Sequence, residues 1–259
     1  MNILRKISVL ACLLVLALSV QAQELRVAAA ADLQFAMKDL AGQFEKQTGI
    51  KVAVTYGSSG NFSTQIQNGA PFDLFFSADV LYVQQLVSAG LTDPESFFVY
   101  AQGHLVLWAP AGANLHLSEK GFEALKDARV QKIAVANPEH APYGRAAVAA
   151  LKKAELYEQV KSKLVYGDNI SQAAQFVQSG NAQVGLIALS LTFADSMSGG
   201  ERWEVPTDLY QPILQGVVII HSSAHKAAAK AFLDFVKSDE GRKLLSNYGF
   251  NPPTAPQKP

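Results

Sequence analysis

The segment Val27-Ala28-Ala29-Ala30-Ala31-Asp32-Leu33 reads as a buried strand that stops at small residues and turns directly into a helix. The segment Val54-Thr55-Tyr56-Gly57-Ser58-Ser59-Gly60-Asn61 soon repeats this pattern. A helix that begins in this way leaves its first backbone N–H groups without intrahelical acceptors and carries partial positive charge. Two such ends directed at one point predict an anion site that needs neither Lys nor Arg. Ordinary capping by Ser, Gly or Asp is the alternative for each turn taken alone.

The N-terminal residues have the pattern of a secretory signal. Arg5 and Lys6 precede an apolar run over residues 7–20, which ends in small residues. We therefore expect a cleaved signal peptide over residues 1–22, a mature chain that begins at Gln23, and a periplasmic location. The apolar run is short for a membrane span, and an uncleaved anchor helix is the alternative.

Composition excludes several classes of chemistry. The 259-residue chain has one cysteine, Cys12, which lies in the apolar run and leaves with the predicted signal. The mature chain then has no cysteine for disulfides, metal ligation or nucleophilic catalysis. The 22 Lys plus Arg balance the 22 Asp plus Glu, so the charge gives no indication of nucleic acid or anionic lipid as a partner.

Short apolar strands alternate with amphipathic helices, which is typical of an α/β protein with mostly parallel sheets. Strands are expected at residues 25–30, 51–56, 74–77, 104–109, 132–136, 163–166, 184–188 and 216–220. Helices are expected at residues 33–47, 80–89, 144–154, 171–179, 224–236 and 239–248. No long linker separates these elements. This predicts two lobes joined by continuous strands, with a ligand cleft between them at the carboxyl ends of strands.

Two later junctions have the same character as the first two. Residues 134–144 run from a strand through a proline-bounded loop into a helix, with Pro142 near the first turn, where its missing N–H costs nothing. The segment Gly167-Asp168-Asn169-Ile170-Ser171-Gln172 follows the strand Leu164-Val165-Tyr166. The chain therefore has four candidate helix N-termini for one anion site, two in each half, although ordinary capping again explains each one singly.

The order and spacing of these segments resemble the periplasmic molybdate-binding proteins, the solute receptors of molybdate importers. The resemblance covers nearly all of the mature sequence. It rests on the alanine-rich first strand with its cap, Gly57-Ser58-Ser59-Gly60, residues 68–79, residues 137–144 and the closing Tyr248-Gly249-Phe250.

This resemblance implies a two-lobe periplasmic binding protein of type II, in which each lobe is a mostly parallel sheet flanked by helices. Lobe 1 would comprise residues 23–102 and 211–259, and lobe 2 residues 103–210. The implied function is that of a monomeric, non-enzymatic receptor without a cofactor. It would bind molybdate, and also tungstate, and deliver this small inorganic oxoanion to an ABC permease and its ATPase.

In that family, backbone N–H groups at helix starts and a few hydroxyls hold the tetrahedral dianion. Carried over by position, the oxoanion-binding residues here are Asp32, Ser59, Tyr143 and Ile170, with Ala31 and Ser58 beside the first two. These are positions for the oxoanion and not ligands for a free metal ion. Ser59 would give its hydroxyl and its N–H, whereas Tyr143 and Ile170 would act through their N–H groups.

Two positions depart from the family pattern. Ala188 stands in the region where some members add a tyrosine hydroxyl. Asp32 stands where the family usually has Ser, Thr or Asn, and an ionised carboxylate can only accept hydrogen bonds. Three accounts of Asp32 stay open. Its side chain caps the helix at Phe35, accepts a proton from a protonated phosphate-like oxoanion, or reaches the metal atom of molybdate or tungstate.

Other solutes give a second class of function. Because of Asp32, the alternative is a receptor for another oxoanion, phosphate-like or sulfate, or for ferric ion. A ferric site needs clustered tyrosinates, and Tyr56, Tyr143 and Tyr166 all lie at strand-to-helix turns.

A hydrolytic enzyme is the least favoured function. His221 and His225 have a four-residue spacing, but no Glu completes a metalloprotease pattern. Gly57-Ser58-Ser59-Gly60 lacks the glycine spacing of a nucleophile elbow. Arg145, just inside a predicted helix, is interpreted as a surface residue or a partner for a nearby acid, not as an anion clamp.

Overall fold

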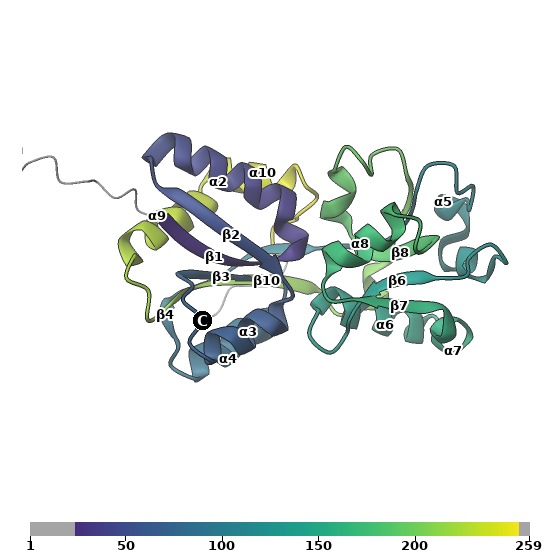
Figure 1. The fold of residues 1–259 in the computed structure, drawn as a ribbon, viewed down its shortest axis with the longest axis horizontal. Coiled ribbons are helices and arrows are strands. Elements are labelled where there is room, and N and C mark those ends of the chain that lie inside the picture. Colours follow the sequence, from purple (N-terminus) through teal and green to yellow (C-terminus); the bar gives the residue numbers. More distant parts are fainter. Residues whose placement is uncertain (1–23, 254–259) are drawn as a thin grey trace, which may run out of the picture.

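The computed structural model describes residues 24–253 and shows two sheets side by side, each covered by helices (Figure 1). Each sheet has five strands. This arrangement confirms the predicted two-lobe α/β fold. The predicted signal peptide and its cleavage point before Gln23 lie outside the described residues, as do residues 254–259. Within the described part of the chain, no helix is long and apolar enough to cross a membrane.

The first sheet has the strand order β2-β1-β3-β10-β4, in which β10 runs against the other four strands. Its strands are β1 (Glu24–Ala30), β2 (Lys51–Gly57), β3 (Leu74–Ser77), β4 (Thr92–Gly103) and β10 (Ile213–Ile220). Its helices are the 3-10 turn η1 (Ala31–Leu33), α2 (Gln34–Thr48), α3 (Ser59–Gln67), α4 (Val80–Ser88), α9 (Lys226–Lys237) and α10 (Asp239–Ser246).

Alternation along β1 divides the core of this lobe between the two faces of the sheet. Leu25, Val27 and Ala29 pack with buried residues of α2 and α9, whereas Ala28 packs with those of α3 and α4. The two groups of helices accordingly lie on opposite faces of the sheet (Figure 1). Because both faces are buried, the strand reads as the continuous apolar run seen in the sequence.

The second sheet has the order β7-β6-β8-β5-β9, in which β5 runs against the other four strands. Its strands are β5 (Leu105–Ala109), β6 (Ile133–Ala136), β7 (Leu164–Gly167), β8 (Val184–Ala188) and β9 (Glu201–Glu204). Its α-helices are α5 (Leu117–Lys120), α6 (Pro142–Lys153), α7 (Tyr157–Val160) and α8 (Ile170–Gln178). Its 3-10 turns are η2 (Gly121–Lys126), η3 (Lys161–Lys163), η4 (Leu189–Phe193) and η5 (Thr207–Leu209).

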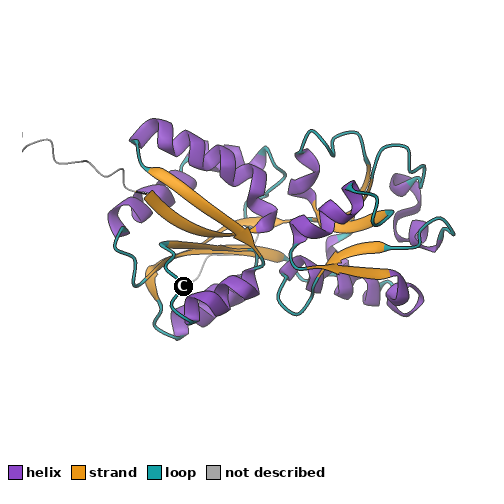
Figure 2. Ribbon diagram, in the orientation of Figure 1, coloured by secondary structure: helices purple, strands orange, loops and turns teal. Residues whose placement is uncertain are grey.

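The chain passes between the two sheets twice (Figure 2). It leaves the first sheet where β4 ends at Gly103 and enters the second at Leu105. It returns between the end of β9 and Ile213. The first crossing is therefore a nearly continuous strand, as the absence of a long linker predicted, whereas the return runs through residues 205–212, which include η5.

Strand register brings the helix starts together. Ala30 at the end of β1 pairs with Gly57 at the end of β2, and Ala136 at the end of β6 pairs with Gly167 at the end of β7. Each of these pairs of parallel strands therefore ends at the same level of its sheet. The turns that follow them begin side by side, at the edge of each lobe that faces the other.

Sequence periodicity missed the strands β4 and β9. The first half of β4 contains Asp93, Pro94 and Glu95, which break the apolar pattern, and its pairing with β10 has two register shifts. The strand β9 is only four residues long and alternates exposed with half-buried positions. Both are edge strands, where burial demands less of the sequence.

Gly144 in α6 tests how tightly this helix packs on the turn that leads to it. A Cβ at this position would collide with the Ala136 carbonyl and lie 2.9 Å from the Pro138 nitrogen, and backbone atoms cannot rotate away. We expect Gly144→Ala to lower the free energy of unfolding by about 2 kcal/mol or more, measured by urea denaturation. Gly42→Ala in α2 is the control, because nothing lies within 4 Å of its Cβ, and it should stabilise by about 0.5–1 kcal/mol. Equal effects of the two substitutions would contradict this packing.

Candidate functional site

The helix starts of the two lobes meet at a small cavity. Its lining comes from turns of both lobes and consists of Ala30, Ala31, Asp32, Gly57, Ser58, Ser59, Ala78, Ala141, Pro142, Tyr143 and Ile170. All six residues that the sequence singled out are among them. The cavity volume is about 10 Å³, close to the space that one water molecule needs. The lobes are therefore closed on this site.

In the first lobe, α3 supplies donors at its start. The Ser58 side chain caps the helix by accepting a hydrogen bond from the Asn61 N–H at 3.4 Å. Ser59, the first residue of the helix, is fully buried, and its N–H has no intrahelical acceptor. The Ser59 hydroxyl oxygen accepts from the Ala78 N–H at 2.9 Å, which leaves its own hydrogen free to donate. Ser59 thus offers two neutral donors at the cavity.

In the second lobe, α6 and α8 begin at the same cavity. Pro142 is the first residue of α6 and Tyr143 the second, whereas Ile170 is the first residue of α8. The backbone N–H groups of Tyr143 and Ile170 therefore lack intrahelical acceptors, and both residues are buried. Asn169 caps α8 by accepting from the Gln172 N–H at 3.0 Å. The α6 and α8 starts add two more neutral donors.

Asp32 turns its carboxylate into a buried hydrogen-bond network. Its Oδ2 accepts hydrogen bonds from the Tyr143 hydroxyl at 3.0 Å and from the Gln215 amide at 2.5 Å. The Gln215 carbonyl oxygen accepts in turn from the Tyr100 hydroxyl at 2.6 Å. The Oδ1 atom of Asp32 is buried and has no partner within residues 24–253. Neither η1 nor α2 has a side-chain cap, so the expected cap at Phe35 is wrong.

Burial dominates the ionisation of this network. It raises the pKa of Asp32 from 3.8 to about 6, although the hydrogen bonds from Gln215 and Tyr143 act in the opposite direction. Burial, reinforced by the charge of Asp32, also raises the pKa of Tyr143 and of Tyr100 well above 10. Both phenols therefore stay protonated and can donate, whereas Asp32 loses its proton near pH 6.

Sequence reasoning missed Gln215, Tyr100 and Gly103, because they lie on β10 and β4 and far from any helix start. A Cβ at Gly103 would collide with the Tyr143 hydroxyl and lie 2.7 Å from the Gln215 Nε2 atom. Glycine is therefore needed where β4 leaves the first lobe. The one available signal was Gln215 itself, a polar residue in an apolar strand, and it is fully buried.

Further hydrogen bonds between the lobes surround the cavity. The Ser171 hydroxyl donates to the Ala31 carbonyl at 3.0 Å, and the Ser190 hydroxyl donates to the Asp32 carbonyl at 2.7 Å. The Gly60 N–H donates to the His140 carbonyl at 2.9 Å. Closure of the lobes thus uses groups that flank the helix starts and leaves their first N–H groups facing the cavity.

Other residues that the sequence singled out lie elsewhere. Of the three tyrosines, only Tyr143 lines the cavity, and Tyr166 is 45 % exposed. His221 contacts Asp93 and His225 contacts Asp73. No group of His, Cys, Asp or Glu within the described residues could hold a metal ion.

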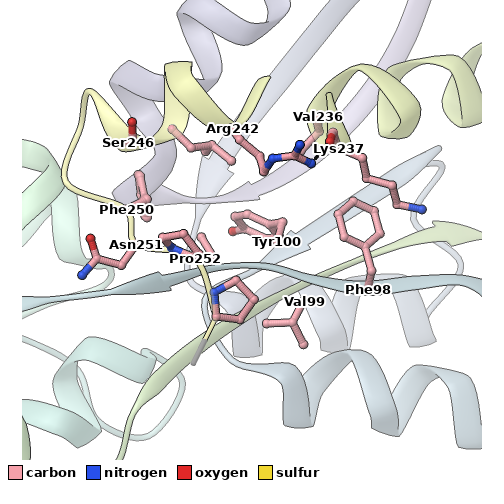
Figure 3. Close-up of a pocket in the computed structure, with 13 residues that line it drawn as sticks. Phe98, Val99, Tyr100, Val236, Lys237, Arg242, Ser246, Phe250, Asn251 and Pro252 are labelled. Atoms are coloured by element: carbon pink, nitrogen blue, oxygen red, sulfur yellow. Dashed lines mark hydrogen bonds between the residues drawn. The ribbon is translucent and has the colours of Figure 1, made fainter. Parts of the chain in front are cut away.

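A larger groove of about 290 Å³ lies on the first lobe, away from the helix starts (Figure 3). It is lined by Phe98, Val99, Tyr100, Ala101, Val236, Lys237, Arg242, Leu245, Ser246, Phe250, Asn251, Pro252 and Pro253. Its two cations are engaged within the lobe. The Lys237 Nζ lies 4.2 Å from the centroid of the Phe98 ring, and Arg242 pairs with Asp239 at 2.5 Å. The small cavity is the better candidate, because the free N–H groups of three helix starts and the Ser59 hydroxyl converge there.

The comparisons place the chain among solute receptors. Residues 25–251 match the family model described as bacterial extracellular solute-binding protein. Molybdate-binding proteins ModA of Azotobacter vinelandii and Rhodobacter capsulatus are 44% and 41% identical to this chain. These matches cover 91% of this chain and 92% of the first relative, and 93% of both chains for the second.

Solved structures give the same picture of the fold. The periplasmic molybdate-binding protein of Azotobacter vinelandii matches with a TM-score of 0.83 and 35% identity, over 89% of this chain and 100% of that one. The sulfate-binding protein SubI of Mycobacterium tuberculosis matches with a TM-score of 0.73 over 89% of this chain and 87% of that one. At 17% identity the second match shows the fold alone.

The buried carboxyl of Asp32 predicts that the free energy of unfolding of the chain depends on pH. Its proton is held up to about pH 6 in the folded chain but is lost near pH 3.8 in the unfolded one. Stability is therefore lost as pH rises from about 4 to 6, and the ionised group costs about 3 kcal/mol above that range.

Asp32→Asn keeps the shape and stays uncharged. It should be more stable than the wild type by about 2–3 kcal/mol at pH 8 and nearly equal to it at pH 4, measured by urea unfolding. A difference that is the same at both pH values would show that the folded chain does not shift this pKa.

Proposed function

The chain belongs to the family of bacterial extracellular solute-binding proteins, and from this premise we propose that it is the receptor that binds molybdate for an ABC importer. It is a periplasmic solute receptor and not an enzyme, as its relatives are binding proteins. Its ligand is an oxoanion. Among the alternatives, neither a different oxoanion nor ferric ion is favoured.

One observation carries the proposal: four helix starts from two lobes close on one small cavity, where backbone N–H groups and the Ser59 hydroxyl are free to donate beside the Asp32 carboxyl. Each start presents N–H groups and partial positive charge, so together they suit an anion held from several sides. A tetrahedral oxoanion has oxygens on every side and can accept from both lobes at once. Because the cavity is small, the lobes must part to admit the ion, and its binding then favours the closed form.

We assign the residues roles on this basis. Ser59 donates its hydroxyl and its N–H to the oxoanion, while Tyr143 and Ile170 donate their N–H groups. We assign Asp32 a role through its backbone N–H; its Oδ2 is bound to Tyr143 and Gln215, whereas its Oδ1 has no partner within residues 24–253. Ala31 and Ser58 shape the two turns of the first lobe. Ala188 supplies no hydroxyl, so we expect no donor from this position.

Selectivity follows if the groups that contact the ion only donate hydrogen bonds and the Asp32 carboxylate does not contact it. A protonated phosphate would bring an O–H group that needs an acceptor, and burying it unpaired is unfavourable. Tungstate matches molybdate in charge and shape, so the site should bind it as well. Sulfate is smaller and would leave some of the donors out of reach.

The finer features of the importer system are also proposals. The receptor is made with a signal peptide over residues 1–22 that is removed before Gln23, and it acts as a monomer without a cofactor. It passes its ion to a membrane permease driven by an ATPase. This view is supported by the basic and apolar pattern of the first 22 residues and by similar proteins of Bacillus subtilis and Clostridium difficile that are described as substrate-binding parts of ABC transporters.

Calorimetric titration of residues 23–259, stripped of ligand, tests the proposed ligand between pH 5 and 8. Molybdate and tungstate should bind tightly with one ion per chain, whereas sulfate, phosphate and ferric citrate should not. Tighter binding of phosphate or sulfate than of molybdate, or no binding of any of these solutes, would contradict the proposal.

Ser59→Ala removes a buried hydroxyl whose hydrogen is free for the oxoanion. A hydrogen bond to a charged group contributes about 1.5–3 kcal/mol, so the affinity for molybdate should fall about 10- to 100-fold in the same titration. Ser63→Ala is the matched control, because Ser63 is buried in the same helix but is not among the residues that line the cavity. The control should keep wild-type affinity. The assignment fails if Ser59→Ala binds as well as Ser63→Ala.

A further inference from the structure

Arg145 lies in the first turn of α6, two residues after Tyr143, yet its side chain leaves its own lobe. It donates to the Asp79 carboxylate at 2.5 Å and to the Tyr82 hydroxyl at 2.8 Å, both on the first lobe. Its guanidinium carbon lies 5.2 Å from the centroid of the Tyr82 ring. One side chain of the second lobe thus makes a charged, a polar and an aromatic contact with the first.

Asp79 is held in place by hydrogen bonds within its own lobe. It caps α4, since its Oδ1 accepts from the Leu81 N–H at 2.9 Å. Its backbone N–H donates to the Ser77 hydroxyl at 3.1 Å, and its carbonyl accepts from that same hydroxyl at 2.7 Å. Only Oδ2 is left for Arg145. A carboxylate fixed in this way loses little side-chain entropy when the ion pair forms, unlike most surface pairs.

The contact joins the two halves of the candidate site. Ala78, whose N–H holds the Ser59 hydroxyl, directly precedes Asp79 in the chain. Among the ion pairs of residues 24–253, the pair of Arg145 with Asp79 is the one that links the first lobe to the second. Its side chains are 38% and 19% exposed, so the pair lies at the rim of the closed boundary and is partly screened by solvent.

Resting on the proposed function, we propose that Arg145, Asp79 and Tyr82 form an interlobe contact that stabilises the closed form and slows release of the bound oxoanion. These residues belong to different lobes, so the contact forms only when the lobes close. None of the three residues lines the cavity or supplies a donor to the ion. It therefore sets how long an ion stays bound and does not set which ion is chosen. Arg145 is a positioning residue in this account, because it pairs with Asp79 and does not contact the ion.

The test compares the release of molybdate from the mature chain and its variants, followed as exchange of bound radioactive molybdate against an excess of the unlabelled ion. Asp79→Asn removes the charge but keeps a good helix cap, so α4 stays intact. Arg145→Gln removes the partner charge. We expect each variant to release molybdate 5- to 30-fold faster than the wild type, with a much smaller change in the association rate.

Three comparisons separate this contact from a general structural effect. The double variant should release no faster than the faster single variant, because both substitutions remove the same contact. Raising the salt concentration should speed release from the wild type but not from Arg145→Gln. Arg129→Gln, which breaks an ion pair of 2.7 Å within the second lobe, should release at the wild-type rate.

The failure of this inference differs from the failure of the proposed function. A wild type that binds no molybdate would overturn the proposed function. A wild type that binds it, with unchanged release from Arg145→Gln and Asp79→Asn, would overturn the interlobe contact alone. Additive effects in the double variant would also overturn it. Arg145→Lys keeps the charge but cannot bond both partners in the same way, so its release rate should lie between those of the wild type and Arg145→Gln.

Discussion

A carboxylate buried at the boundary between two lobes needs hydrogen-bond donors, and here they come from both sides of the boundary. Asp32 follows the first strand, Gln215 lies on the last strand of the same sheet, and Tyr143 comes from the other lobe. Leaving a buried carboxylate without these partners would cost several kcal/mol, so the closed arrangement of the lobes and the ionisation of Asp32 are linked. The requirement also explains why glycine stands at position 103, where any side chain would displace the Tyr143 hydroxyl.

The same principle bears on the charges around the cavity. The Oδ2 atom of Asp32 is bound by Tyr143 and Gln215, its Oδ1 has no partner within residues 24–253, and Arg145 is paired with Asp79. The free donors at the cavity are backbone N–H groups and the Ser59 hydroxyl. Such dipoles are fixed by the strand register and the helix starts, so they need little rearrangement when an anion enters. Closure then depends on contacts around the cavity, and the anion accepts hydrogen bonds from the donors inside it.

The sequence predicted those parts of the fold and site that depend on local pattern. Residues 27–33 and 54–61 indicated two helix starts, and the structure brings them to one cavity with the starts at Tyr143 and Ile170. Local pattern also suggested a helix cap for Asp32, which was wrong because partners far away in the chain claim its carboxylate. Gln215 could not be predicted, since its role depends on the pairing of β10 with β3 and β4. The edge strands β4 and β9 were not predicted for a related reason, because each of them faces solvent along part of its length.

The central proposal is that the site binds its oxoanion through neutral donors and that the Asp32 carboxylate does not contact the ion. X-ray absorption at the molybdenum edge, recorded on the mature chain loaded with one molybdate, tests this claim most directly. If only N–H and hydroxyl groups contact the ion, the molybdenum should keep its tetrahedral shell of four oxygens, and the spectrum should match that of free molybdate. A shell of five or six oxygens would mean that a carboxylate oxygen of Asp32 has joined the metal, and it would contradict the account.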